Sequence, residues 1–184
     1  MYVFMEDGKV ELDPETEDLF EREANNFASE TIFQLDKYEK MAADYKVSIK
    51  TPIDLSKVFG SSIYASMRRY VQTHFAPLAL AVYDPPEKNR VDTNFSLRRT
   101  PIYSVSFIKK FGAIQTLCSC AETDFLGSIL KSARLNTHHV CGVKDLNGDY
   151  HEVALHVFSN SYEKFVMLIP LKMSSSKNLL FCLN

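Results

Sequence analysis

Three groups of side chains in this 184-residue sequence could do metal chemistry. The first is the carboxylate of Glu21, which stands at helical spacing from Ala24 and Ala28. The second is the pair His151 and His156, separated by a stretch that begins with a glutamate. Carboxylate oxygen, imidazole nitrogen and thiolate sulfur all bind zinc. The third group combines soft ligands from two segments: Cys118, Cys120, His138, His139 and Cys141.

Glu21 is expected on the flank of a buried helix face, close to Ala24, Ala28 and Ile32. An unpaired charge in such a place costs several kcal/mol or is neutralised by protonation. The carboxylate therefore needs a partner. A divalent metal is one such partner, and an arginine or lysine is the more common one, so helix geometry leaves both open.

His151 and His156 do not have the spacing of a zinc-binding helix. Histidines four residues apart share a helix face, whereas five residues apart they diverge by roughly 140°. Their stretch follows an Asn-Gly turn and alternates apolar with polar residues, which predicts a strand. A strand places His151 on the face of Val153 and His156 on the opposite face, so the two histidines cannot share one metal.

The cysteine and histidine group has enough ligands for a structural zinc, but it lacks a Cys-x-x-Cys pair. The alternative is that these are small buried thiols and histidines at strand edges. The stoichiometry of zinc on the purified chain would separate the two. A catalytic Cys-His pair is less supported, because the sequence marks neither an activating helix N-terminus nor an orienting third residue.

Composition describes an ordinary folded protein. The chain is 46% hydrophobic and 24% charged with a net charge of -2, which excludes a disordered chain and a globally basic nucleic-acid binder. Apolar runs do not approach the ~20 residues of a membrane span, and the N-terminal residues lack the pattern of a signal peptide. We expect a cytoplasmic location, no membrane partner and reduced thiols for the four cysteines.

The first third of the chain is predicted to be helical. Acidic residues after Pro14 favour a helix N-terminus, and the first helix is expected to end near Asp36. Helix continues over 37–45, and 47–51 is predicted to be extended. Apolar residues at steps of three and four predict one buried stripe on the first helix. This stripe comprises Phe20, Ala24, Phe27, Ala28, Thr31 and Leu35.

Residues 52–73 have the outline of a helix-turn-helix: a short helix that stops at Gly60, a cap at Ser61 and Ser62, and a longer helix over 63–73. As a recognition helix, the second helix would use Tyr64, Arg68 and Arg69 to contact DNA. Further phosphate contacts are sparse, so a packing role is the alternative. The candidates for the exposed face are Tyr64, Ser66, Met67, Arg68 and Arg69, and those for a face packed on the first helix are Ile63, Met67, Tyr70 and Val71.

Composition changes after His74 toward β-branched and aromatic residues, so we divide the chain into a helical part, 1–75, and a sheet part, 76–184. The expected fold class is α+β with a mainly antiparallel sheet. An Asn-Gly turn predicts a hairpin around Asn147, a helix is expected over 125–133, and 179–183 is expected to be an edge strand. The remaining predicted strands are 78–83, 103–108, 140–144, 150–158 and 165–171.

The N-terminal half resembles the ImmA/IrrE family of zinc metallopeptidase-like proteins. The ordered segments that carry the resemblance are 32–36, 50–71 and, ahead of them, Glu21, Ala24, Asn25, Phe27 and Ala28. The resemblance implies that Glu21 is a zinc ligand and that two histidines and a general-base glutamate come from an upstream His-Glu-x-x-His helix. It also implies that 52–73 belongs to a helical scaffold. The strand, helix and hairpin order of the sheet part is similar in outline to the GAF-like sensor domain of some relatives, and the alternative is a sheet that only stabilises or presents the helical part.

The sequence contains no His-Glu-x-x-His, and one glutamate does not make a catalytic zinc site, which takes three protein ligands and a water. The first hypothesis is therefore the C-terminal part of a zinc endopeptidase that cleaves a transcriptional repressor, catalytically incomplete here, with the missing helix upstream of Met1. The second is a non-catalytic regulatory module that binds a protein partner or a small ligand without zinc. The third is a helix-turn-helix DNA-binding protein.

Overall fold

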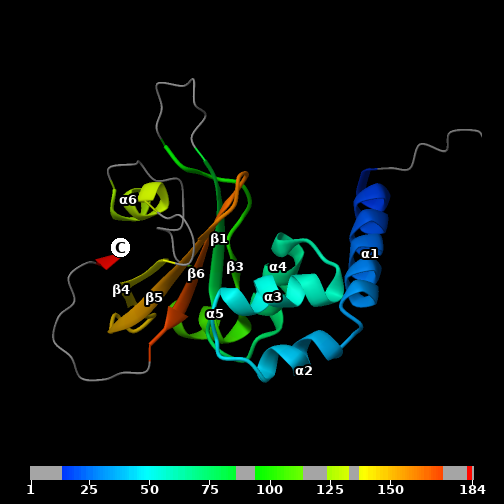
Figure 1. Ribbon diagram of the computed structural model, residues 1–184, viewed down its shortest axis with the longest axis horizontal. Coiled ribbons are helices and arrows are strands. Elements are labelled where there is room, and N and C mark those ends of the chain that lie inside the picture. Colours follow the sequence, from blue (N-terminus) through cyan, green and yellow to red (C-terminus); the bar gives the residue numbers. More distant parts are fainter. Residues whose placement is uncertain (1–13, 86–93, 114–123, 133–136, 172–181, 184) are drawn as a thin grey trace, which may run out of the picture.

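The computed structural model describes residues 14–85, 94–113, 124–132, 137–171 and 182–183. Within these ranges the chain forms six helices and seven strands, and the N-terminal helices precede a mainly antiparallel sheet (Figure 1). The predicted α+β fold class is confirmed. None of the helices in the described ranges has the length and apolar character needed to cross a membrane.

The N-terminal half consists of helices α1 (Pro14–Ile32), α2 (Lys37–Ala43), α3 (Lys50–Phe59) and α4 (Ile63–Thr73). Gly60 ends α3 in the left-handed conformation, at φ 62°, which glycine adopts without a steric penalty. Ser62 then caps α4, because its hydroxyl accepts a hydrogen bond from the Ala65 N–H at 3.1 Å. The predicted short helix, glycine turn and longer helix are confirmed. The predicted extended segment 47–51 is wrong, since α3 already begins at Lys50.

The sheet has the order β2-β1-β6-β5-β4-β7, and β3 also pairs with β1. Every pairing is antiparallel except that of β7 with β4. The predicted C-terminal edge strand is thus present in its last residues, and 179–181 lie outside the described residues. The strands are β1 (Ala79–Asp84), β2 (Ser96–Leu97), β3 (Ile102–Tyr103), β4 (Thr137–Lys144), β5 (Tyr150–Ser159), β6 (Lys164–Pro170) and β7 (Cys182–Leu183).

The predicted hairpin joins β4 to β5. Gly148 takes φ 89°, and the Asp145 carboxylate accepts hydrogen bonds from the N–H groups of Asn147 and Asp149 at 2.9 and 3.0 Å. The predicted helix over 125–133 is also present, as α6 (Phe125–Ser132). The predicted strand 103–108 is wrong beyond Tyr103, because Ser104 caps a helix, α5 (Val105–Phe111), by accepting a hydrogen bond from the Phe107 N–H.

The sheet carries a hydrophobic core on each face. Along β1, Ala79 and Ala81 belong to the core shared with α5 and α6, whereas Leu80 and Val82 belong to the core shared with α2, α3 and α4. This alternation is the period of two that a strand imposes. Figure 1 shows α3 and α4 on one side of the sheet and α6 on the other. The sheet therefore lies between two cores, one that it shares with α5 and α6 and one that it shares with α2, α3 and α4.

Helix α1 lies at the edge of the molecule, beyond α4 (Figure 1). The prediction that its apolar stripe is buried is wrong: Phe20 is 56% exposed and Phe27 is 75% exposed. The helix also ends earlier than predicted, because Gln34 and Leu35 take positive φ values of 52° and 57° and turn the chain toward α2. The buried face of α4, which includes Met67 and Tyr70, packs mainly on α2, α3 and the sheet, and from the predicted first helix only the region of Phe33 belongs to this core.

Candidate binding groove

Glu21 lies on the exposed surface of α1, as do Ala24, Asn25 and Ala28. The expectation that Glu21 flanks a buried face is wrong, because no other described element covers this stripe of the helix. Within the described residues, no group of three or more His, Cys, Asp or Glu side chains is placed to hold a metal. The zinc-ligand role of Glu21 therefore stays a prediction from the family resemblance.

The cysteine and histidine group falls only partly within the described structure. Cys118, Cys120 and the side chain of His138 lie outside the described residues. Cys141 is buried in the core under α5 and α6, and His139 is half-buried on the same strand, two residues away. The prediction of a structural zinc at this group stays untested by the geometry.

His151 and His156 lie on opposite faces of β5, as predicted. The His151 ring packs edge-on against Phe111, with 5.5 Å between ring centroids, and its Nε2 lies 2.8 Å from Asp145 Oδ2. His156 stands opposite Met167 in the β5–β6 pairing, on the face that packs against α2, α3 and α4. The two histidines therefore do not form a shared metal site.

Arg69 points into the molecule, and its predicted place on the exposed face of α4 is wrong. Its side chain is 14% exposed and pairs with the carboxylates of Glu30 on α1 and Glu39 on α2. It also donates to the carbonyl oxygen of Leu35 at 3.2 Å. Burial alone would lower the pKa of Arg69, but the two carboxylates outweigh it and hold this pKa above its ordinary value. Ser66 and Met67, also expected on the exposed face, are fully buried.

Arg68 and Tyr64 do lie on the accessible side of α4, where they line a groove together with Gln72. These three residues are spaced by four, so they share one face of the helix. One wall of the groove comes from α1 and includes Asn25, Asn26 and Ser29. The other comes from the segment that joins β2 to β3 and continues into β3; it comprises Arg99, Thr100, Pro101, Ile102 and Tyr103.

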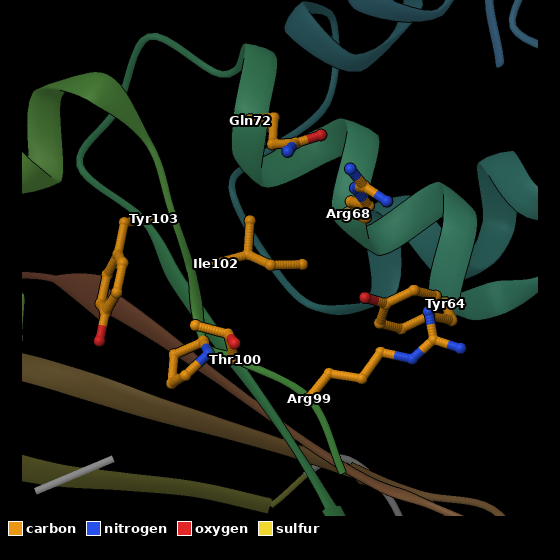
Figure 2. A pocket seen from close by; sticks show the side chains of 8 residues that line it. Tyr64, Arg68, Gln72, Arg99, Thr100, Ile102 and Tyr103 are labelled. Atoms are coloured by element: carbon orange, nitrogen blue, oxygen red, sulfur yellow. The ribbon is translucent and has the colours of Figure 1, made fainter. Parts of the chain in front are cut away.

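The groove consists of two contiguous open cavities of about 460 and 410 Å³. They share Tyr64, Arg68, Gln72 and Arg99, so these four side chains form the centre of the groove. Figure 2 shows the Arg99 side chain reaching across to Tyr64, with Arg68 and Gln72 following along α4. The Arg99 guanidinium carbon lies 4.5 Å from the centroid of the Tyr64 ring, which is cation–π geometry.

The centre of the groove is positively charged, although the whole chain has a net charge of -2. Arg68 and Arg99 are exposed cations, whereas the other charged lining residues, Arg69 and Glu30, neutralise each other in an ion pair. Glu30 is the one carboxylate among the described lining residues of the two cavities. The arrangement is suited to holding an anionic group between two guanidinium groups.

The sequence indicated Tyr64 and Arg68 but not Arg99, which lies in a different segment of the chain. One signal was available: the sequence contains a second arginine pair, Arg98 and Arg99, besides Arg68 and Arg69. Arg98 turns away from the groove and pairs with Asp84 and Glu163, each at 3.3 Å. Arg99, in contrast, lines the groove.

A scan against protein-family models and a search of the curated proteins each found no match to this chain. The resemblance of the Glu21 segment to the ImmA/IrrE family therefore rests on the residues themselves. The groove, in contrast, is defined by the geometry of α1, α4 and the β2–β3 segment.

Proposed function

We propose that this chain is a binding module that holds a segment of a partner protein in the groove between α1, α4 and the β2–β3 segment. The observation that carries this proposal is the meeting of Arg68, Arg99 and Tyr64 at the centre of the groove. Arg and Tyr are the residues in which binding energy concentrates at protein interfaces. The family resemblance implies a transcriptional repressor as the partner.

The shape of the groove supports an extended ligand. Its walls come from three elements that are distant in sequence, and its two cavities run continuously from Asn25 on α1 to Tyr103 on β3. Apolar contacts are available along this path from Ile32 and Ile102, and polar ones from the amide of Gln72. A peptide segment offers both kinds of group at regular intervals.

The same geometry gives less support to the DNA-binding alternative. A recognition helix must protrude far enough to enter a major groove about 12 Å wide. Here the accessible face of α4 is flanked by α1 on one side and by residues 99–103 on the other. Exposed acids of α1, which include Asp18, Glu21 and Glu23, would also repel a phosphate backbone.

The experiment is a selection of peptides from a displayed random library on the purified chain. We expect enriched peptides that bind the wild-type chain and lose about tenfold or more in affinity for Arg68→Gln and for Arg99→Gln. Arg98→Gln is the matched control, because Arg98 is paired outside the groove. Selection without enrichment, or peptides that bind both groove variants as tightly as wild type, would contradict the proposal.

A second candidate function is the C-terminal part of an ImmA/IrrE-type zinc peptidase. The observation that favours it is the position of Glu21 on the exposed surface of α1, where its carboxylate is accessible to a zinc-binding helix from outside the described residues. The test is the genomic sequence upstream of the Met1 codon. An in-frame His-Glu-x-x-His there, with zinc binding by the extended chain that Glu21→Gln weakens, would support it, and the absence of the motif would refute it.

A further inference from the structure

We infer that the groove selects acidic segments, so that the peptide it holds carries Asp or Glu side chains opposite Arg68 and Arg99. This inference rests on the proposed binding function and specifies its ligand. It follows from which of the arginines around the groove form ion pairs within the chain and which of them face the groove instead. Arg69 and Arg98 are each satisfied by two carboxylates of this chain, whereas their neighbours Arg68 and Arg99 face the groove.

The neutral side chains of the groove reinforce the preference for an anion. Asn25, Asn26 and Gln72 carry amide donors, and Ser29 and Thr100 carry hydroxyl donors. Glu30, the carboxylate among the described lining residues, has its oxygens engaged by Arg69. An incoming carboxylate therefore meets donors and two cations, and it does not meet an uncompensated negative charge.

The contact between Arg99 and Tyr64 holds one of the two cations in place. The Arg99 guanidinium carbon lies over the Tyr64 ring, 4.5 Å from its centroid, and a guanidinium that contacts a ring through its flat face keeps its edge for two parallel hydrogen bonds. A carboxylate fits that fork with both oxygens. Because the side chain of Arg99 is held by the ring before the ligand arrives, less of its rotational freedom is lost on binding.

Exposed acidic side chains on α1 favour an acidic peptide over a nucleic-acid strand as the ligand. Asp18, Glu21 and Glu23 lie further along the same helix as Asn25 and Asn26. A short acidic peptide can end before it reaches them, whereas a nucleic-acid strand continues its charge in both directions at regular spacing. The groove therefore favours a segment with a few carboxylates over a polynucleotide.

The experiment measures fluorescence anisotropy with three labelled hexapeptides that alternate glycine with glutamate, glutamine or lysine, and with a labelled single-stranded oligonucleotide. We expect the full chain at low salt to bind the glutamate peptide at least tenfold more tightly than the glutamine peptide. Arg68→Gln and Arg99→Gln should each weaken it about tenfold, and Arg98→Gln should leave it within about twofold. Tyr64→Ala, which removes the ring under Arg99, should weaken it more than Tyr64→Phe.

Two results would overturn the inference. The first is binding of the glutamate and glutamine peptides with equal affinity, or with no loss in the groove variants. The second is tighter binding of the oligonucleotide through the same two arginines. If the library selection yields groove-dependent peptides without Asp or Glu, the binding function stands and the acidic preference alone is refuted. Circular dichroism of each variant shows whether its fold is retained.

Discussion

The two arginine pairs of this chain are used in a similar way: one member forms two ion pairs within the chain, and the other faces the groove. On α4, successive side chains point about 100° apart, so Arg69 reaches Glu30 and Glu39 while Arg68 faces the groove. Near the sheet edge, Arg98 turns to Asp84 and Glu163 while Arg99 faces the groove. In each pair, therefore, one arginine forms ion pairs within the chain, and the other is the one that we propose contacts a ligand.

Replacement of Arg69 by alanine is expected to lower the free energy of unfolding by about 1–3 kcal/mol. The change removes both ion pairs and the hydrogen bond to Leu35, and it leaves the half-exposed carboxylates of Glu30 and Glu39 without their shared partner. Urea denaturation measures the effect. Arg68→Ala is the control and should change stability by less than about 0.5 kcal/mol, because Arg68 is exposed. Equal effects of the two substitutions would contradict the anchoring role of Arg69.

Asp145 is expected to make the stability of the chain fall in acid. The hydrogen bond from His151 lowers the pKa of Asp145, burial opposes this, and the N–H groups of Asp149 and Asn147 lower the pKa further, so the folded pKa lies below its usual range. A carboxyl whose folded pKa is depressed stabilises the fold above its unfolded pKa, and this contribution is lost as the pH falls below about 4.

The test compares thermal unfolding of the wild-type chain and Asp145→Asn at pH 6 and pH 3. The neutral amide cannot titrate, so the variant should lose less stability than wild type between these two pH values. Asp149→Asn, which replaces an exposed carboxylate of the same turn, is the control. An identical acid dependence of Asp145→Asn and wild type would refute the assignment.

Among the elements, the turn between α3 and α4 depends on a backbone conformation that favours glycine. Gly60→Ala is expected to destabilise the chain by about 1–2 kcal/mol, because φ is 62° and a Cβ there meets no atom within 4 Å, so the cost is conformational and not steric. Gly60→Asn should cost less, since Asn tolerates the left-handed region. Thermal denaturation ranks the three proteins. Equal stability of the alanine variant and wild type would contradict this explanation.

The elements that were predicted correctly carry local signals. Gly60 and Ser62 define the α3–α4 turn, and Asn147-Gly148 defines the β4–β5 hairpin, because these residues act on their own backbone. The element at 103–108 was predicted wrongly. Its alternation of apolar and polar residues indicated a strand, but the hydroxyl of Ser104 caps a helix that begins at Val105. The stripe on α1 was misjudged for a different reason: periodicity indicates which face is apolar, but not whether anything covers it.

The core between the sheet and helices α2, α3 and α4 joins the helical part of the molecule to the sheet part. Leu80 is fully buried there, alongside Tyr38, Met67 and Phe165. Leu80→Ala is expected to reduce the free energy of unfolding by about 2–5 kcal/mol and to shift the urea transitions seen by circular dichroism and by tyrosine fluorescence together. Val58→Ala, at a 62% exposed position of α3, should change little. Separate transitions for the two probes would show that the helices and the sheet unfold independently.

The candidate site is also a property of the whole molecule, which limits what the sequence could reveal about it. Tyr64 and Arg68 were recognisable from their place on a predicted helix. Arg99 was not, because its position beside Tyr64 depends on the pairing of β2 and β3 with β1, which brings residues 99–103 against α4. Local patterns do not contain that long-range pairing.

The reversal of the chain after α1 has an evolutionary consequence. Gln34 and Leu35 both occupy the left-handed region, at φ 52° and 57°, where a β-branched side chain or a proline is strongly disfavoured. Homologous proteins that share this bend are therefore expected to vary freely among Gly, Asn and Asp at these two positions and to be depleted of Val, Ile, Thr and Pro. If homologous proteins show this pattern, selection has maintained the bend that orients α1, and α1 forms one wall of the groove.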